Sequence, residues 1–274
     1  MKLIESKVEL IEQQPGLEGM YKQIELAGRT CYKSEDKITE DSAKEFVDRM
    51  IKLGHGAMLE HGTVYLKTDV DYGSSIYLEL EQKYTRNRYS RVDFEGGVMY
   101  VTTNLRVLVE NDWFDDLLYA CEPTEYHEKR ITARFTCDRG VSHEIVRHRV
   151  MSFAQESTRY CNYGKDKFDN ELTFIHPSWS LAKMHEEDYR GDRFIDTLHE
   201  IEKQYLYLIE NGWLPQQARQ ILPNALKTEI VVTGFESDWK HFFKLRTAGA
   251  AHPDCSKLAK ELKQKLIENG YSFN

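Results

Sequence analysis

Residues 138–160 read DRGVSHEIVRHRVMSFAQESTRY, and this stretch decides how the rest of the chain is interpreted. Its first half carries three apolar residues at the spacing of one buried helical stripe: Val141, Ile145 and Val146. Glu144 precedes Arg147 and His148 by three and four residues, which predicts that the three share an exposed side of a short helix. Two basic side chains and a carboxylate are therefore expected together on the surface.

The second half of the stretch turns polar after Ser152 and is predicted to be extended. Because strand side chains alternate, Gln155, Ser157 and Arg159 are expected to point to one side. They present an amide, a hydroxyl and a guanidinium beside the basic triplet 147–149. Guanidinium groups pair two oxygens at once, so a nucleotide is the natural candidate ligand. The alternative is a solvated basic helix face with ordinary loop polar groups.

The composition is that of a globular protein. The chain has 274 residues, of which 41% are hydrophobic and 30% charged, enough for one large domain or two small ones. Its net charge of −8 argues against nonspecific nucleic-acid binding, which needs a basic surface. A locally basic pocket in an acidic protein favours a small anionic ligand instead.

The five cysteines are scattered and form no Cys-x-x-Cys pair, so neither a disulfide framework nor a zinc site is expected. His55, Glu60 and His61 invite a metal assignment, but their spacing matches no metal-binding motif, and no metal is expected. There is no signal-peptide pattern at the N-terminus and no run of about 18 apolar residues. The expectation is a reduced, cytoplasmic protein with no nucleic-acid or membrane partner.

Hydrophobic periodicity and turn residues predict an α+β fold, with helices flanking a modest mixed or antiparallel sheet. The predicted strands are 7–13, 63–70, 75–80, 98–102, 130–137 and 228–233. The predicted helices are 17–26, 39–53, 105–109, 113–119, 194–208, 215–222, one capped by Ser237-Asp238 that carries Arg246, and one that starts at Pro253. With no repeat or linker to divide it, the chain 1–274 is expected to be a single domain. Dinucleotide-binding and phosphate-loop glycine motifs are absent, so a Rossmann crevice is not expected.

Arg147-His148-Arg149, seven further residues, Ser157 and then Arg159-Tyr160 resemble the signature of the flavin-dependent thymidylate synthases. Further segments similar to motifs of that family are 27–32 (AGRTCY), 54–61 (GHGAMLEH), 212–223 (GWLPQQARQILP) and 245–246 (LR). The resemblance implies that family's non-Rossmann fold, in homotetramers that bind the cofactor between subunits. Against compact members, this chain carries an insertion at about 71–126, with a predicted hairpin turn at Gly96-Gly97.

By the same resemblance, the activity is reductive methylation of dUMP to dTMP, with methylenetetrahydrofolate as carbon donor and NADPH-reduced FAD as hydride source. The residues that match substrate positions are Glu144, Arg147, Gln155, Glu156, Ser157, Thr158, Arg159, Arg219 and Arg246, with Ser157 and Arg246 implied as catalytic. The residues that match flavin positions are His55, Ala57, Glu60, Arg147, His148, Arg149, Gln155, Ser237 and His241. Arginine is a sensible electrophilic partner, because it stays protonated and favours negative charge on uracil carbonyls.

Three features depart from the family pattern. Glu144 stands where many members carry glutamine, and it would repel a phosphate unless it pairs with Arg147 or contacts the sugar. Ala57 replaces a common Thr or Ser. The triplet 235–237 replaces a common Asn-x-Arg and His241 a common Asn, which predicts a rearranged or weaker flavin contact.

Two alternatives stay open. The insertion and the changed flavin positions also fit a related flavin- and folate-dependent enzyme that modifies another pyrimidine nucleotide. The Tyr/Arg run 84–91 fits a noncatalytic nucleotide- or single-strand-binding protein on the same scaffold, although Asp93 and Glu95 favour a solvated hairpin face. Cys161 has cationic neighbours that would lower a thiol pKa, but a flavin enzyme needs no such thiol, so a structural role is expected.

Overall fold

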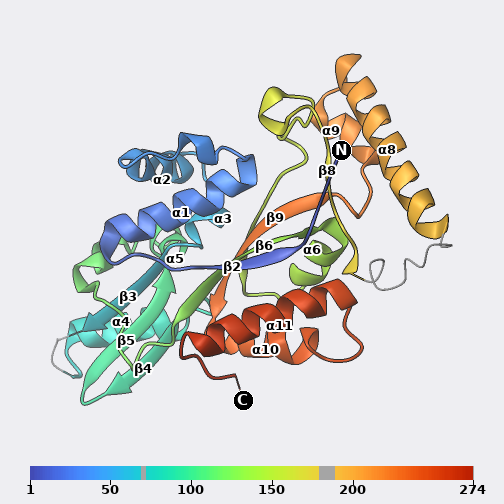
Figure 1. The fold of residues 1–274 in the computed structure, drawn as a ribbon. Helices are drawn as coiled ribbons and strands as arrows, with labels where there is room; N and C mark the ends of the chain where they lie inside the picture. Colours follow the sequence, from blue (N-terminus) through green and yellow to red (C-terminus); the bar gives the residue numbers. More distant parts are fainter. Residues whose placement is uncertain (69–71, 179–188, 274) are drawn as a thin grey trace.

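The computed structural model describes residues 1–68, 72–178 and 189–273. Its main sheet is antiparallel, with the strand order β2-β6-β9-β7 (Figure 1). These strands are β2 (Lys7–Ile11), β6 (Arg130–Asp138), β9 (Lys227–Phe235) and β7 (Ser152–Gln155). β6 and β9 pair along their whole length, from Arg130 opposite Phe235 to Asp138 opposite Lys227. This long pair fixes the positions of the segments that leave its two ends.

Helices cover both faces of the main sheet, because β6 and β9 bury side chains on both. One face packs against α6 (Arg139–Ile145), α10 (Glu236–Arg246) and α11 (Pro253–Glu268). The other packs against α1 (Gly16–Tyr32), where Ala27 contacts Ala154 and Val231. Figure 1 shows α10 and α11 below this sheet and α1 above it. Successive side chains of a strand point to opposite faces of a sheet, so neighbouring residues on β7 or β9 face α1 and the α6–α10 layer in turn.

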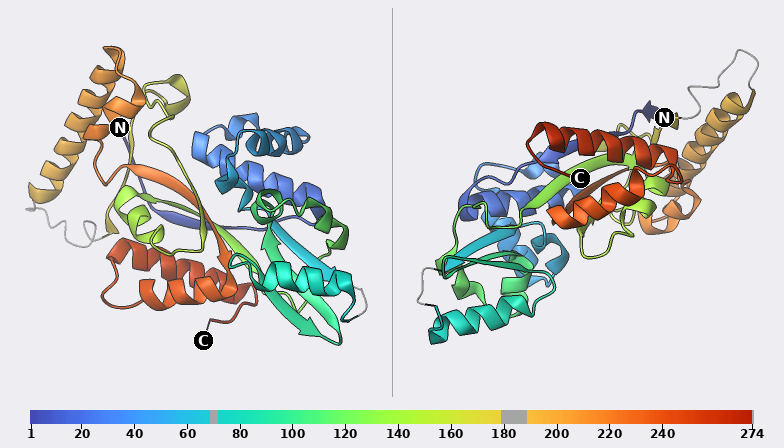
Figure 2. Two further views of the ribbon diagram at one scale, coloured as in Figure 1. Left: turned by 180° about the vertical axis from the view of Figure 1, so that it is seen from behind. Right: turned by 90° about the horizontal axis from the view of Figure 1, so that it is seen from below.

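A second antiparallel sheet, β3-β5-β4, lies beside the main one (Figure 2). Its strands are β3 (Thr63–Thr68), β5 (Val98–Asn104) and β4 (Arg91–Glu95). The helices that pack with it are α2 (Ser42–Lys52), α3 (Gly56–Leu59), α4 (Ser75–Thr85), α5 (Leu105–Glu110) and η2 (Phe114–Tyr119). Gly96 and Gly97 join β4 to β5 with φ values of +58° and +83°, as a two-residue type I′ turn requires.

The third core forms around a short parallel pair, β1 (Lys2–Ile4) and β8 (Thr173–Ile175). The helices beside this pair are η3 (Asp166–Phe168), α8 (Tyr189–Glu210), α9 (Pro215–Ala218) and η4 (Arg219–Ile221). The remaining short helix, η1 (Glu35–Lys37), follows α1 in the chain. No helix among the described residues is long and apolar enough to cross a membrane.

The α+β fold class is confirmed, and so are most of the predicted elements. The strand predicted at 63–70 ends at Thr68, and its last two positions lie outside the described residues. The helix predicted at 17–26 continues to Tyr32, the segment 113–119 forms a 3-10 helix, and the segment 215–222 is divided between α9 and η4.

The strand predicted at 75–80 is wrong, because these residues begin the helix α4. The Ser74 side chain caps this helix by accepting a hydrogen bond from the Tyr77 N–H at 3.2 Å. Tyr77, Leu80 and Tyr84 are buried at helical spacing, and Tyr84 donates from its hydroxyl to Asp116 at 2.8 Å. The Tyr/Arg run thus starts in the last turn of α4, where Tyr84 is buried, so the prediction of a solvated hairpin face is wrong at Tyr84.

Two local predictions also need correction. Val146 is 37% exposed rather than buried, because α6 ends at Ile145 and the helical stripe ends with it. α10 starts at Glu236, so the Ser237-Asp238 pair lies inside the helix rather than before it. The Asp238 carboxylate still stabilises the start of α10 by accepting a hydrogen bond from the Phe235 N–H at 3.1 Å.

Candidate functional site

Arg246, at the end of α10, reaches across to the end of α6. Its Nε donates to His148 Nε2 at 2.8 Å, and its two terminal nitrogens donate to the Glu144 carboxylate at 2.5 Å and the Glu144 carbonyl at 2.7 Å. Arginine can only donate, so His148 Nε2 must be unprotonated and the neutral ring carries its proton on Nδ1. The Glu144 carboxylate pairs with Arg246, a partner that the sequence analysis did not consider beside Arg147.

His148 is buried, so the prediction that Glu144, Arg147 and His148 share an exposed side holds only for the first two. The His148 ring packs edge-on against Phe242 at 4.8 Å, and the His241 ring lies 6.0 Å away. Burial, together with the positive charge of Arg246, lowers the pKa of His148 to about 4. The imidazole is therefore neutral near pH 7.

Arg219 lies in η4 and is exposed. The chain that follows it contacts the first residue of α6, where the Arg139 N–H donates to the carbonyls of Asn224 at 2.9 Å and Leu226 at 3.1 Å. Since Arg246 contacts the other end of α6, the segment after Arg219 and the side chain of Arg246 lie at opposite ends of this short helix.

The polar segment after β7 is fixed by contacts to three elements. Gln155 donates from its amide to the hydroxyls of Ser142 at 2.8 Å and Thr228 at 3.2 Å. The Ser157 N–H donates to the Cys31 carbonyl at 3.0 Å, at the end of α1. Burial alternates from Gln155 to Thr158: Gln155 and Ser157 are partly exposed, whereas Glu156 and Thr158 are buried. The extended conformation predicted as far as Arg159 is wrong, because residues 158–160 form a turn in which the Tyr160 N–H donates to the Ser157 carbonyl at 3.1 Å.

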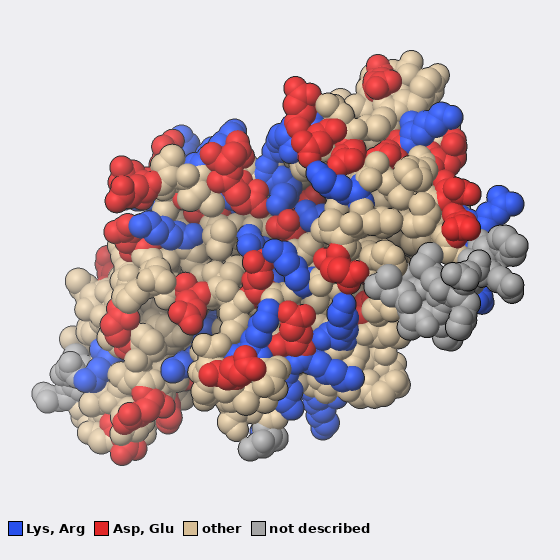
Figure 3. All heavy atoms as spheres, viewed as in Figure 1, with Lys and Arg blue, Asp and Glu red and all other residues tan. Residues whose placement is uncertain are grey.

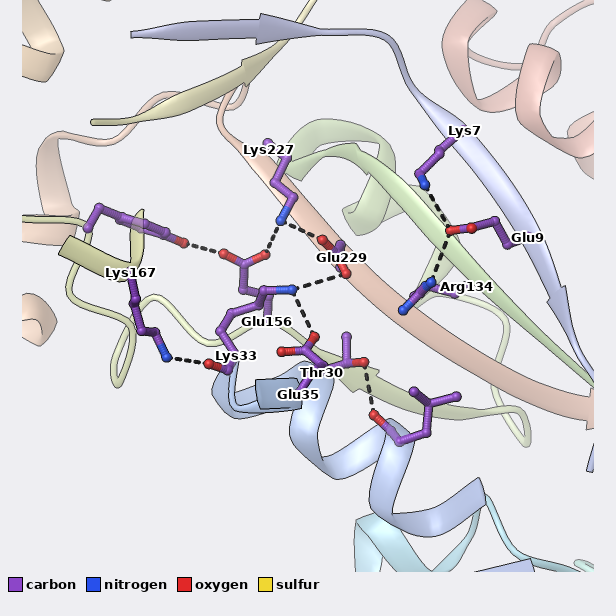
Figure 4. Close-up of polar contacts among 12 residues, drawn as sticks. Lys7, Glu9, Thr30, Lys33, Glu35, Arg134, Glu156, Lys167, Lys227 and Glu229 are labelled. Atoms are coloured by element: carbon purple, nitrogen blue, oxygen red, sulfur yellow. Dashed lines mark hydrogen bonds and ion pairs between the residues drawn. The ribbon is translucent and has the colours of Figure 1, made fainter. Parts of the chain in front are cut away.

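Glu156 belongs to a buried ionic network on the α1 face of the sheet (Figure 4). Lys227 Nζ lies 2.9 Å from the Glu156 carboxylate and 2.7 Å from that of Glu229, and Lys33 Nζ lies 3.2 Å from Glu229. Tyr163 donates from its hydroxyl to Glu156 at 2.8 Å. Burial alone would raise the pKa of Glu229, but Lys227 and Lys33 outweigh it and lower the pKa to about 2. Glu229 is thus held as a carboxylate, and Lys227 joins it to Glu156.

Three segments distant in sequence meet at an aromatic pair on the same face. The rings of Tyr32, at the end of α1, and Tyr160 lie 5.5 Å apart. The Tyr32 hydroxyl lies 3.4 Å from Nδ1 of His55, which precedes α3. Arg159 lies over the Tyr160 ring at 5.2 Å, and Tyr160 is 57% exposed. Sequence reasoning named His55 and Arg159 but not the tyrosines, although each tyrosine closes a motif segment that it had singled out.

The remaining predicted cofactor residues are spread over the surface. Those that are exposed are Ala57, Arg147, Arg149, Ser237 and His241. Glu60 is half-buried, and its carboxylate pairs with Arg106 at 2.5 Å. Ser237 and His241 lie one turn apart on α10, and the Ser237 N–H donates to Glu128 at 2.9 Å.

His61 is fully buried rather than part of a site. Its Nδ1 lies 2.8 Å from the Thr233 hydroxyl on β9, and burial lowers its pKa to about 3. Among the described residues, no group of three or more His, Cys, Asp or Glu side chains could hold a metal ion.

Cys161 is buried, and burial and the Glu156 carboxylate raise the pKa of its thiol to about 12. The predicted lowering of that pKa by cationic neighbours is wrong, because desolvation and a nearer anion dominate. Cys161 is therefore a protonated thiol of the third core near pH 7.

Two cavities in the described part of the chain are compared with the predicted site residues. The larger, of about 770 Å³, lies between β2, β3 and the end of α11, and none of the predicted site residues lines it. The smaller, of about 260 Å³, is lined by Glu60, by residues 87–89 of the predicted insertion, and by Ser152 at the start of β7.

Comparison with known proteins gives one family match. The family described as thymidylate synthase complementing protein matches residues 123–269. A flavin-dependent thymidylate synthase of Geobacter sulfurreducens is 23% identical over 262 residues, which are 93% of this chain and 80% of that protein. One of Pyrococcus furiosus is 33% identical over 132 residues, which are 48% of this chain and 52% of that protein.

Among solved structures, a UMP/dUMP methylase, PolB from Streptomyces cacaoi bound with 5-Br dUMP, is 16% identical. The superposition covers 98% of this chain and 93% of that one, with a TM-score of 0.47. The family match includes α6, the segment after β7, α9 and α10, and it leaves His55, Ala57 and Glu60 outside.

Proposed function

The chain belongs to the thymidylate synthase complementing protein family, the family of the flavin-dependent thymidylate synthases, and we propose that it methylates dUMP to give dTMP. In this proposal methylenetetrahydrofolate donates the carbon unit, and NADPH reduces a bound FAD. The relatives that match the chain over most of its length are named as enzymes of this kind, which are methyltransferases.

One observation supports the proposal most strongly: separated motif segments meet in the folded chain. Tyr32, His55 and Tyr160 come from three such segments and are in contact. Arg246 and His148 come from two of them and are hydrogen-bonded. The first contact lies beside α1 and the second beside α6 and α10, on opposite faces of the main sheet. Groups that act on one nucleotide must lie close together, so we propose that one nucleotide reaches both groups across a subunit boundary.

The exposed donors fit a flavin, but one chain does not enclose it. When bound, the flavin supplies the hydride. His55, Arg147 and Arg149 are exposed and can pair with its ring and phosphate oxygens. None of these three donors lines either of the two cavities described above. We therefore propose that a second subunit covers the flavin, which accords with the homotetramer that the family resemblance implies.

Arg246 is proposed to stabilise negative charge on the uracil ring. A guanidinium has five N–H groups, and contacts to Glu144 and His148 use three of them, which leaves two for a carbonyl oxygen. These contacts fix the guanidinium before substrate arrives, so little reorganisation is needed at the moment of reaction. The Glu144 carboxylate offsets part of the positive charge of the Arg246 guanidinium.

The remaining predicted substrate residues are proposed to hold the sugar and phosphate. Arg147, Arg159 and Arg219 are exposed guanidinium groups, which suit a phosphate oxygen pair. Ser157 is held at its backbone by Cys31, so that its hydroxyl has a defined position. Glu156 and Thr158 are buried, and we assign them the support of this segment rather than direct contact with the nucleotide.

Product analysis tests the proposal. Purified protein supplied with FAD, NADPH and methylenetetrahydrofolate should convert labelled dUMP to dTMP and leave labelled dCMP unchanged. Conversion of dCMP instead would favour the related enzyme for another pyrimidine nucleotide. A colourless protein that makes neither product and binds oligonucleotides in a salt-sensitive way would favour the noncatalytic alternative.

The subunit arrangement has its own test. Sedimentation of the flavin-loaded protein should give the mass of four chains of 32.2 kDa each. A monomer that still binds flavin tightly would contradict the shared site. We also propose that residues 1–274 act as one domain, with 71–126 as an insertion in it.

A further inference from the structure

The smaller cavity joins the predicted insertion to the main sheet. Arg88 and Tyr89, between α4 and β4, line one side, and Arg106 of α5 lines another. Arg130 at the start of β6 and Ser152 at the start of β7 close it from the main sheet. Residues with no assigned role in binding therefore share a wall with Glu60, a predicted cofactor residue.

Three guanidinium groups face this cavity, and their charges are balanced differently. Arg106 is neutralised, because it lies 2.5 Å from the Glu60 carboxylate and 2.8 Å from that of Glu110. Arg88 donates to the Tyr89 hydroxyl and lies 4.7 Å from the centre of that ring. In the described part of the chain, no carboxylate forms an ion pair with Arg88.

Arg130 is the most unusual of the three. Its terminal nitrogens donate to neutral oxygens only: the Glu60 carbonyl at 2.8 Å, the Thr63 hydroxyl at 3.4 Å and the Ser152 hydroxyl at 3.2 Å. Its Nε is buried without a hydrogen-bond partner. Burial lowers the pKa of Arg130 to about 10, so the group is still charged at neutral pH. An enclosed cation without a carboxylate is costly unless an anion compensates it.

The charges of the cavity wall leave a positive excess. Its ionisable side chains are three arginines and two glutamates, which gives a net charge of about +1 in a chain whose overall charge is −8. Both glutamates are already paired with Arg106, so Arg88 and Arg130 remain for a ligand. Their forked donors match the paired oxygens of a phosphate or a carboxylate.

We propose that this cavity binds the anionic end of one of the enzyme's substrates, through Arg88 and Arg130. At about 260 Å³ it accommodates part of a ligand rather than the whole of one. The phosphate of dUMP is assigned above to Arg147, Arg159 and Arg219. The two other substrates of the proposed reaction also carry an anionic group: the reductant has phosphates, and the folate has carboxylates in its tail. The identity of the ligand rests on the proposed function, whereas the anion site itself rests on the geometry alone.

The first experiment needs no turnover. Pyrophosphate is titrated calorimetrically into flavin-loaded protein, and the wild type is compared with Arg88→Ala. Loss of one charge-assisted hydrogen bond should weaken binding about tenfold. Arg86→Ala is the matched control, because Arg86 is an exposed arginine two residues away that does not line the cavity. The pyrophosphate affinity of the Arg86→Ala variant should stay within about twofold of the wild-type affinity, since surface groups away from the ligand contribute little to binding.

The second experiment separates the two sources of the anion. In steady-state assays, Arg88→Ala should raise KM for one substrate about tenfold at unchanged kcat, as expected when uniform binding is lost. A rise for NADPH that is absent with NADH assigns the cavity to the reductant phosphate, and a rise for methylenetetrahydrofolate assigns it to the folate carboxylates. The proposal is overturned if pyrophosphate affinity is equal in the Arg88 and Arg86 variants, or if neither KM changes. An inactive wild type would refute the proposed function, and the titration would still decide the anion site.

Discussion

Lys227→Met should destabilise the protein strongly, because it leaves a buried carboxylate unpaired. The Lys227 side chain is 14% exposed and bridges Glu156, which is 1% exposed, and Glu229, which is 16% exposed. Glu229 keeps Lys33, but Glu156 keeps only the Tyr163 hydroxyl. Removing one partner of a buried ion pair costs about 3–5 kcal/mol. At about 2–4 °C per kcal/mol for a chain of this size, Tm should fall by roughly 10 °C.

Calorimetry or urea unfolding measures this loss, and Lys203→Met is the matched control. Lys203 lies 4.0 Å from Glu200 and is 76% exposed, so its loss should cost less than about 0.5 kcal/mol. The double variant Lys227→Met, Glu156→Gln should be more stable than Lys227→Met alone, because it removes the stranded charge. Equal stabilities of Lys227→Met and Lys203→Met would refute the assignment of a buried network.

Two further predictions concern Ser157, Arg246 and His148. Ser157→Ala and Arg246→Ala should keep the fold and the bound flavin, but each should lower kcat for dTMP formation by about 10²–10³-fold. Arg134→Ala, which removes only an ion pair to Glu9, should leave kcat unchanged. Turnover at the wild-type rate in either site variant would remove the role assigned to it. His148 has a pKa of about 4 when folded and 6.5 when unfolded, so its contribution is complete above pH 6.5 and is lost as pH falls towards 4. Stability should decline in that range by up to roughly 3 kcal/mol more in wild type than in His148→Gln, and parallel pH curves would contradict this.

Local patterns were sufficient for the elements that carry the site. The alternation of β6, the spacing of Val141 and Ile145 in α6, and the apolar side of α11 are properties of neighbouring residues, and they predict the main sheet and its helices. The segment 75–80 was predicted wrongly because Tyr and Ile suit a strand as well as a helix. Its helical state depends on the Ser74 cap and on burial against the second core.

The contacts of the site could not be read from spacing. Glu144 pairs with Arg246, which is 102 residues away, rather than with the nearby Arg147. His148 is buried because Phe242 of α10 packs on it, a contact between distant segments. Arg130 gave no signal in the sequence, since a single arginine at the start of a strand is ordinary. Its chemistry comes from the neutral partners that the fold places around it.

A titration of dUMP into the flavin-loaded protein, followed by the flavin absorption spectrum, tests the central claim most directly. If residues of the separated motifs hold the uracil ring against the flavin, dUMP should cause a saturable spectral change, and Arg246→Ala should weaken it. No spectral change on addition of dUMP to a protein that does bind flavin would contradict the account.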